Sequence, residues 1–344
     1  MGRIEKLTAS LEEKQGFYIS SFANIFYYSG FTSEDARLLI TKNESILFTD
    51  SRYTVQAKEQ AKDFEIRDIK CIDELKDYNI EKLGFEEDNL TVRELAKINV
   101  GDIKVFPAGK IISKPRQAKD RFEIAKIAEA ERLGDEAFSY ILDFIKPGRS
   151  EKEIALELEF FLRRKGAEKL SFDTIAASGY RSCMPHGVAS DKVIEKGEFL
   201  TLDFGCVLDG YCSDMTRTVA VGTPSDEMRN IYDIVLRAQL SALEAIGKGK
   251  PCKDIDYIAR KVIEDAGYGK NFGHSLGHSV GIEIHENPNL SPKSDDILEV
   301  GNVVSVEPGI YLDGFFGVRI EDLVVIDEKN TVNLTKSKKE LIII

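Results

Sequence analysis

The sequence predicts an α+β fold divided into two domains. Its 344 residues exceed the length at which a single hydrophobic core usually stops growing. Amphipathic helical stretches lie between short apolar runs joined by turn-forming pairs, which is typical of helices packed on antiparallel strands. Hydrophobic residues make up 42% and charged residues 31% of the chain, so the composition excludes a disordered, collagenous or disulfide-scaffold protein.

The first hundred residues alternate short strands and helices, as in a small α/β domain. Apolar runs predict strands over 17–20 and 45–49, and helical spacing predicts helices over 53–62 and around 92–97. A stretch with proline and glycine, ending at Lys114-Pro115, interrupts this pattern. The predicted domains are therefore residues 1–114 and 115–344.

The second domain is predicted to combine four helices with antiparallel strands. The second helix begins at a capping box, in which Ser150 and Glu153 each satisfy the other's backbone amide. Turn signals at Asp209-Gly210 and Asp313-Gly314 join strands that lie between and after the helices. Amphipathic spacing places the four helices over 120–146, 150–165, 226–246 and 252–266.

Charge and cysteine usage predict a cytoplasmic protein. The net charge is −12, so a surface suited to nucleic acid is not expected. The five cysteines are scattered and odd in number, as free thiols are in a reducing compartment. No run reaches the roughly 20 apolar residues that cross a bilayer, so no membrane partner is expected either.

Histidines are concentrated late in the chain. There are four in all, and three of them, His274, His278 and His285, fall within twelve residues. Imidazole binds divalent transition metals and titrates near neutral pH. The cluster therefore predicts a role in metal binding or proton transfer.

Two pairs of acids lie on predicted hairpins. A two-residue turn at 209–210 sets Asp214 opposite residue 205, which shares a strand face with Asp203. A three-residue turn centred on residue 314 sets Glu307 opposite Glu321. Carboxylates on apolar strands are costly unless they are paired or bind metal. Four carboxylates and an imidazole suit two divalent cations, with Mn²⁺ favoured over a structural zinc, and the chemistry indicated is metal-assisted hydrolysis.

These residues, with Pro185-His186-Gly187 upstream, resemble the pita-bread metallopeptidases. That family includes methionine aminopeptidase, aminopeptidase P and prolidase. The matching motifs stand in one fixed order: Leu202–Gly205, Ser213–Thr218, Gly277–Gly281, Ile284–Glu286, Val306–Gly309 and Arg319–Asp322.

The N-terminal part resembles one branch of that family. Asn24–Phe31, Asp50–Tyr53 and Leu83–Glu86 are similar to the creatinase-type N-terminal domain of aminopeptidase P and prolidase. His274 fits the His-x-x-Gly-His pattern of the same branch. The resemblance implies a creatinase-like N-terminal domain, a pita-bread catalytic domain, and hydrolysis of Xaa-Pro bonds by a hydroxide that bridges two metals.

The resemblance also implies a role for each site residue. Glu307 is expected to bind metal and to shuttle a proton, and Ser279 stands where many relatives have glycine. The implied metal ligands are Asp203, Asp214, His278, Glu307 and Glu321, of which Asp214 and Glu321 bridge the ions. The implied catalytic residues are His186, His285 and Glu307, and the implied substrate-binding residues are His274, Tyr311 and Arg319.

The resemblance further implies two divalent ions, with Mn²⁺ expected and Co²⁺ or Zn²⁺ as alternatives. It implies a homodimer that acts on peptides with proline at the second position. Dipeptidase and aminopeptidase P activities share these motifs, so the choice between them stays open. The alternatives are a methionine-type aminopeptidase, a metal-free creatinase-like hydrolase and a non-catalytic binding protein, and the last two would be expected to lose metal ligands.

Overall fold

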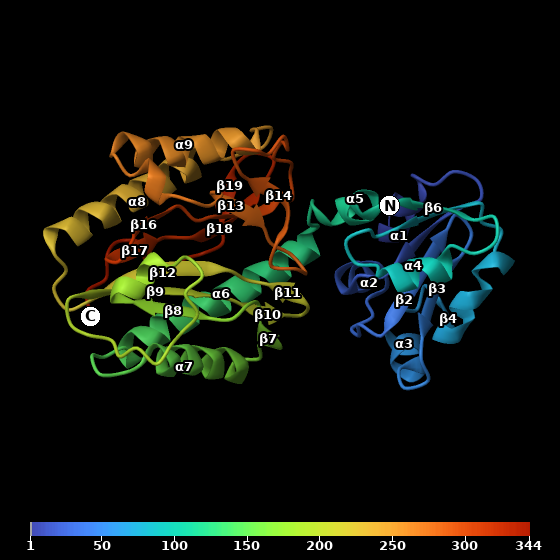
Figure 1. Ribbon diagram of the computed structural model, residues 1–344, viewed down its shortest axis with the longest axis horizontal. Helices are drawn as coiled ribbons and strands as arrows, with labels where there is room; N and C mark the ends of the chain where they lie inside the picture. Colours follow the sequence, from blue (N-terminus) through green and yellow to red (C-terminus); the bar gives the residue numbers. More distant parts are fainter. Residues whose placement is uncertain (1) are drawn as a thin grey trace. The chain divides into compact units, whose positions relative to one another are not determined.

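The computed structural model describes residues 2–344, except for the side chains of residues 72–74 and 76. The chain divides into two compact units, Met1–Arg116 and Gln117–Ile344, coloured blue to teal and green to red in Figure 1. Within the described residues, every helix is too short or too polar to span a lipid bilayer.

The N-terminal unit is built on a six-stranded mixed sheet. Its strands are β1 (Gln15–Ile19), β2 (Ala36–Thr41), β3 (Ser45–Thr49), β4 (Glu65–Asp68), β5 (Lys82–Phe85) and β6 (Lys104–Pro107). They are ordered β4-β3-β2-β1-β5-β6. β2 pairs antiparallel with β1 and β3, and the other three pairs are parallel. The parallel pairs make this an α/β unit, as predicted.

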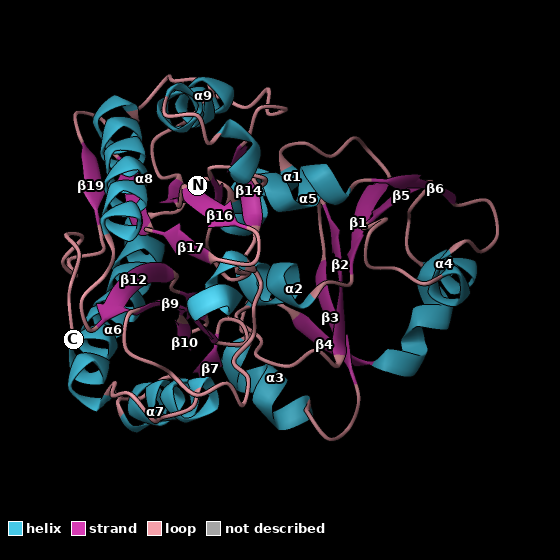
Figure 2. Ribbon diagram, turned by 60° about the vertical axis from the view of Figure 1, so that its left-hand side comes forward, coloured by secondary structure: helices cyan, strands magenta, loops and turns pink. Residues whose placement is uncertain are grey.

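Helices cover both faces of this sheet. They are α1 (Arg3–Thr8), α2 (Phe22–Ser29), α3 (Thr54–Gln60), α4 (Val92–Ile98) and α5 (Gly109–Ser113), with 3₁₀ helices η1 (Ile69–Asp77) and η2 (Lys114–Arg116). In Figure 2, α4 lies on one side of the sheet and α2 and α3 lie on the other. Helix α2 was not predicted, although Ser21 caps its start and Gly30, at φ +73°, ends it.

The C-terminal unit contains the four predicted helices. They are α6 (Arg121–Phe144), α7 (Glu151–Arg164), α8 (Asp226–Ala245) and α9 (Cys252–Asp265), and short 3₁₀ helices occur at η3 (Gly179–Cys183) and η4 (Gly269–Asn271). Both ends of each of these four helices agree with the prediction to within two residues. The capping box at Ser150 and Glu153 is present, because the residue types of the cap determine where α7 begins.

Thirteen strands of this unit form four antiparallel sheets among the described residues. The strands are β7 (Lys169–Leu170), β8 (Ile175–Ser178), β9 (Glu198–Phe204), β10 (Cys206–Leu208), β11 (Tyr211–Cys212), β12 (Met215–Val221), β13 (Gly277–Ser279), β14 (Glu286–Leu290), β15 (Val303–Val306), β16 (Gly309–Leu312), β17 (Phe316–Arg319), β18 (Asp322–Ile326) and β19 (Thr331–Asn333). The sheet orders are β11-β10-β7, β12-β9-β8, β14-β13-β15-β18-β19 and β16-β17.

The strands lie between two pairs of helices (Figure 1). α6 and α7 cover β8, β9 and β12 through a core that includes Ile141, Leu158 and Leu202. α8 and α9 cover β15 and β18 through a second core that includes Ile231 and Val304. Each such side chain stabilises the fold by about 1.5–3 kcal/mol when it is buried. This is the predicted α+β arrangement, and it holds the acid-bearing strands between two rigid layers.

Candidate metallopeptidase active site

Asp203 and Asp214 lie on one hairpin in the predicted register. β9 pairs with β12, and β10 pairs with β11, in a single continuous register around the turn at Asp209-Gly210. Both turn residues have positive φ, +48° and +77°, as a two-residue hairpin turn requires. A Cβ at Gly205 would lie 1.9 Å from the carbonyl oxygen of Ser213, so only glycine permits this close approach of the strands.

Glu307 and Glu321 lie on a second hairpin, also in the predicted register. β16 and β17 pair around a three-residue turn centred on Gly314 at φ +74°. β15 and β18 continue the same register beyond the two glutamates. The two glutamates therefore face each other between these two ladders, with Glu321 1% exposed.

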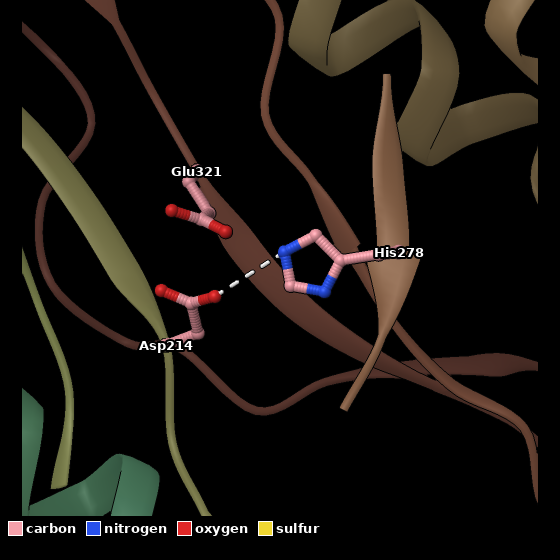
Figure 3. Close-up of side chains that lie close together, drawn as sticks. All are labelled: Asp214, His278 and Glu321. Carbon is pink, nitrogen blue, oxygen red and sulfur yellow. Dashed lines mark ion pairs between the residues drawn. The ribbon is translucent and has the colours of Figure 1, made fainter. Parts of the chain in front are cut away.

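His278 on β13 joins the two acid-bearing hairpins. Its Nε2 lies 3.5 Å from Asp214 Oδ2 and 3.4 Å from Glu307 Oε1. One donor atom from each of Asp214, His278 and Glu321 lies within 4.8 Å of the other two. Figure 3 shows these three side chains converging from separate segments of the chain. The Ser305 hydroxyl accepts a hydrogen bond from the His278 backbone amide and donates one to Glu307 Oε1, so it connects the strand of His278 to Glu307.

The acids of this cluster lack partners that a cation would supply. Among the described residues, Asp203 Oδ1 and Glu321 Oε1 are buried without a hydrogen-bond partner. Burial, together with the neighbouring carboxylates, raises the pKa of Asp214 and of Glu321 well above the usual range. Burial also lowers the pKa of His278, which favours the neutral, metal-binding imidazole. Four carboxylates and one neutral imidazole therefore fit divalent metal.

A hydrogen-bonded chain runs from Asp203 to His274. Arg319 donates from Nη2 to Asp203 Oδ2 at 2.6 Å and from Nη1 to the Tyr311 hydroxyl at 2.8 Å. That hydroxyl lies 2.9 Å from His274 Nε2. Burial lowers the pKa of His274 to about 4 and raises the pKa of Tyr311 to about 12. Both rings are therefore neutral at neutral pH. Of the four side chains in this hydrogen-bonded series, Arg319 alone carries a positive charge.

One cavity of about 470 Å³ brings the predicted residues together. Tyr311 is connected to this cavity by hydrogen bonds to His274 and Arg319, which line it. The rings of His278 and His285 meet edge-on, with their centroids 4.4 Å apart. Nine of the ten predicted site residues line the cavity: His186, Asp203, Asp214, His274, His278, His285, Glu307, Arg319 and Glu321.

The sequence analysis missed two hydroxyl groups that hold the acids. Thr216 Oγ1 donates to Glu321 Oε2 at 2.7 Å, and Ser305 Oγ donates to Glu307 Oε1 at 3.1 Å. Each stands two positions from a predicted acid, Asp214 or Glu307. Because side chains on a strand alternate between faces, extending the period-two pattern by one step would have found both.

The sequence analysis also missed Glu151, which holds the segment that contains His186 through hydrogen bonds. This fully buried carboxylate accepts hydrogen bonds from the backbone and hydroxyl of Ser178 and of Ser190, and from Arg181 Nε. The sequence shows only an acid in the first turn of a helix. Acids are common at that position because they interact favourably with the helix dipole, so Glu151 gave no sign of a buried network.

Comparison with known proteins identifies the family of each unit of the chain. Residues 125–328 match metallopeptidase family M24, and residues 3–118 match the creatinase/prolidase N-terminal domain. The Xaa-Pro dipeptidase of Pyrococcus furiosus is 39% identical over 349 residues, which cover 99% of each chain.

Solved structures are similar as well. A Xaa-Pro dipeptidase from Bacillus anthracis superposes with a TM-score of 0.96 at 45% identity, covering 99% of each chain. An X-Pro aminopeptidase from Thermotoga maritima superposes with a TM-score of 0.93 at 42% identity, covering 100% of each chain. The chain therefore belongs to metallopeptidase family M24, in the aminopeptidase P and prolidase branch with a creatinase-type N-terminal domain, and is a metal-dependent peptidase.

Proposed function

We propose that this protein hydrolyses the Xaa-Pro bond of dipeptides or of peptide N-termini. The observation that carries the proposal is the convergence of four carboxylates and His278 on one cavity, with buried carboxylate oxygens that lack a partner among the described residues. Relatives named Xaa-Pro dipeptidase and X-Pro aminopeptidase support the substrate class. No feature of the site favours a methionine-type, creatinase-like or non-catalytic alternative.

Two divalent ions are proposed, held by Asp203, Asp214, His278, Glu307 and Glu321. When bound, such ions polarise a carbonyl oxygen and make a water molecule acidic enough to act as a nucleophile near neutral pH. Mn²⁺ is proposed because a carboxylate-rich set suits a harder ion than a thiolate site does, with Co²⁺ and Zn²⁺ as the ions to compare.

Glu307 is proposed to move the proton. Burial raises the pKa of its carboxyl, which favours uptake of a proton by this group. Ser305 orients the carboxylate through Oε1. We assign to Glu307 the removal of a proton from the attacking water and its delivery to the proline nitrogen, which then leaves as an amine.

His186 and His285 are proposed to donate hydrogen bonds to the oxygen of the scissile carbonyl as negative charge develops there. Burial lowers the pKa of His285, and a neutral imidazole retains one N–H donor for this purpose. His274, Tyr311 and Arg319 are proposed to contact the substrate. Because the proline nitrogen offers no N–H, the ring must be recognised by shape. The apolar cavity residues Phe172, Ile175, Val188 and Ile284 suit that task.

The proposal includes the domain boundaries, the oligomeric state and the cellular location. We assign residues 1–114 to a creatinase-like domain and residues 115–344 to the catalytic domain, and we propose a homodimer. The five cysteines are free thiols, which supports a reducing, cytoplasmic location.

The test is hydrolysis of Ala-Pro and Ala-Pro-Ala-Ala, side by side, by Mn²⁺-loaded protein, with Ala-Ala as the control. Cleavage of Ala-Pro alone identifies a dipeptidase, and cleavage of the longer peptide identifies an aminopeptidase P. If metal is bound and neither proline peptide is cleaved, or Ala-Ala is cleaved equally well, the Xaa-Pro proposal is wrong.

A further inference from the structure

A buried lysine contacts the residues that directly follow two of the site histidines. Lys119 Nζ donates to Ser279 Oγ at 2.8 Å and lies 3.1 Å from Glu286 Oε2. Ser279 follows His278, and Glu286 follows His285. The side chains of Lys119 and Glu286 are 1% and 4% exposed, so this ion pair is shielded from solvent.

Glu286 holds the turn that precedes His285. Its Oε1 accepts hydrogen bonds from the backbone amides of Ile282 at 3.0 Å and Glu283 at 3.2 Å. A Cβ at Gly281 would lie 2.6 Å from Glu286 Oε2, so the carboxylate fills the space inside the turn. Lys119 places a positive charge beside this buried carboxylate, which offsets part of the cost of removing the carboxylate from water.

Ser279 connects the same lysine to the strand of His278. Its hydroxyl donates to the carbonyl oxygen of Val303 at 2.8 Å and accepts from Lys119. The lysine is fixed at its backbone too, because its amide donates to the carbonyl oxygen of Gly301 at 2.8 Å. Lys119 is thus held at both ends.

We propose that Lys119 is a positioning residue, which sets the separation of the His278 and His285 rings through Ser279 and Glu286. It contacts neither substrate nor metal in this role. The inference rests on the proposed function, in which His278 binds metal and His285 contacts the scissile carbonyl. Displacing either ring would weaken metal binding and slow the chemical step, while substrate binding would change little.

The main test variant is Lys119→Met combined with Glu286→Gln, because Lys119→Met alone leaves a buried charge without a partner. Four quantities are measured: Co²⁺ affinity by calorimetry with the metal alone, the visible absorption of bound Co²⁺, and kcat and KM for Ala-Pro. We expect a loss of about 10–100-fold in Co²⁺ affinity and in kcat, with a changed absorption band and KM within about two-fold of the original.

Ser279→Ala keeps the ion pair and removes the hydrogen bond between Lys119 and Ser279. It should therefore change Co²⁺ affinity, the absorption band and kcat in the same direction as the double variant, by a smaller factor. It decides the question if the double variant does not fold. Lys192→Met is the matched control. Lys192 is 15% exposed and pairs with Glu198, and its loss should lower thermal stability without changing Co²⁺ affinity.

The proposal is overturned if the folded double variant and Ser279→Ala keep the Co²⁺ affinity, the absorption band and the kcat of the original protein. It is also overturned if Lys192→Met lowers Co²⁺ affinity equally. Failure of the proposed function looks different. The unaltered protein would then bind Co²⁺ and leave Ala-Pro intact, and the Co²⁺ measurements would still test Lys119.

Discussion

Two buried glutamates, one in each unit, differ in how their charge is accommodated. Among the described residues, Glu86 of the N-terminal unit accepts five hydrogen bonds, from the backbone and hydroxyl groups of Ser20 and Ser21 and from the Asn24 amide, at 2.5 to 3.2 Å. Glu321 of the C-terminal unit accepts one from Thr216, and its second oxygen is buried without a partner there. Glu86 is 5% exposed and Glu321 is 1% exposed, so burial alone does not distinguish them.

The difference teaches that the number of donors, rather than burial, separates an acid held by hydrogen bonds from the acid that is proposed to bind metal. Asp322, next to Glu321 in the chain, repeats the lesson. It accepts from Arg217, Lys339 and Asn333 at 2.6 to 2.7 Å. Burial raises the pKa of Asp322, but the charges of Arg217 and Lys339 outweigh burial and lower it overall. Adjacent strand residues point to opposite faces, so one carboxylate meets cations and the other meets the cavity.

The largest effect is expected for Glu321→Gln. A neutral amide is a poor replacement for a carboxylate ligand, so hydrolysis of Ala-Pro should fall about 10³-fold or more. The stability of chelator-treated protein should not fall, because the change removes a poorly satisfied charge. Kinetics and thermal unfolding measure these two quantities. Activity within about tenfold of the original would exclude Glu321 as a ligand.

The next largest effect is expected for Glu86→Ala, which should lower stability and leave metal binding unchanged. Each buried donor that is left without an acceptor costs about 1–3 kcal/mol, so the free energy of unfolding should fall by several kcal/mol. Co²⁺ affinity should not change. Urea unfolding measures the loss, and the exposed Glu59→Ala serves as the control. An equal loss in both variants would mean that the hydrogen bonds to Glu86 contribute little.

His274 extends the comparison to a base and predicts a pH dependence. Burial lowers its pKa from 6.5 to about 4, so between these values the unfolded state binds more protons than the native state. Stability from this group is therefore present above pH 6.5 and is lost as the pH falls toward 4, by about 2–3 kcal/mol.

Urea unfolding of the original protein and of His274→Gln at pH 7 and pH 4.5 measures this dependence. The variant should be less stable at pH 7, and its stability should fall less on acidification. Parallel losses in the two proteins would contradict the assignment to His274.

The smallest effect is expected at Gly314, in the turn between the two facing glutamates. Its φ is +74° and a Cβ there would meet no atom within 4 Å, so Gly314→Ala should cost only the backbone strain, about 1 kcal/mol. Gly205→Ala is the matched comparison, because its Cβ would collide with the Ser213 carbonyl. Chemical unfolding should rank Gly205→Ala as much the more damaging of the two.

The amino-acid sequence alone was enough to predict the four helices of the C-terminal unit and the registers of both hairpins, although it did not reveal α2. Helix ends follow from local capping residues such as Ser150, and the registers follow from short turns with an alternation of two residues. These features depend on neighbours within a few positions or across one turn, so residue types are sufficient to predict them. The placement of Asp203 with Asp214, and of Glu307 with Glu321, followed from them.

The groups that satisfy each buried charge, or fail to, come from distant parts of the sequence and are apparent only in the folded protein. Lys119 and Glu286 are 167 positions apart, and Arg217 and Asp322 are 105 positions apart. Glu151 resembles an ordinary acid of a first helical turn until the segment from Ser178 to Ser190 packs against it. No local pattern encodes such pairs, because they exist only after the packed layers bring the strands and helices together. The buried oxygens without partners at Asp203 and Glu321 become apparent only once those pairs are known.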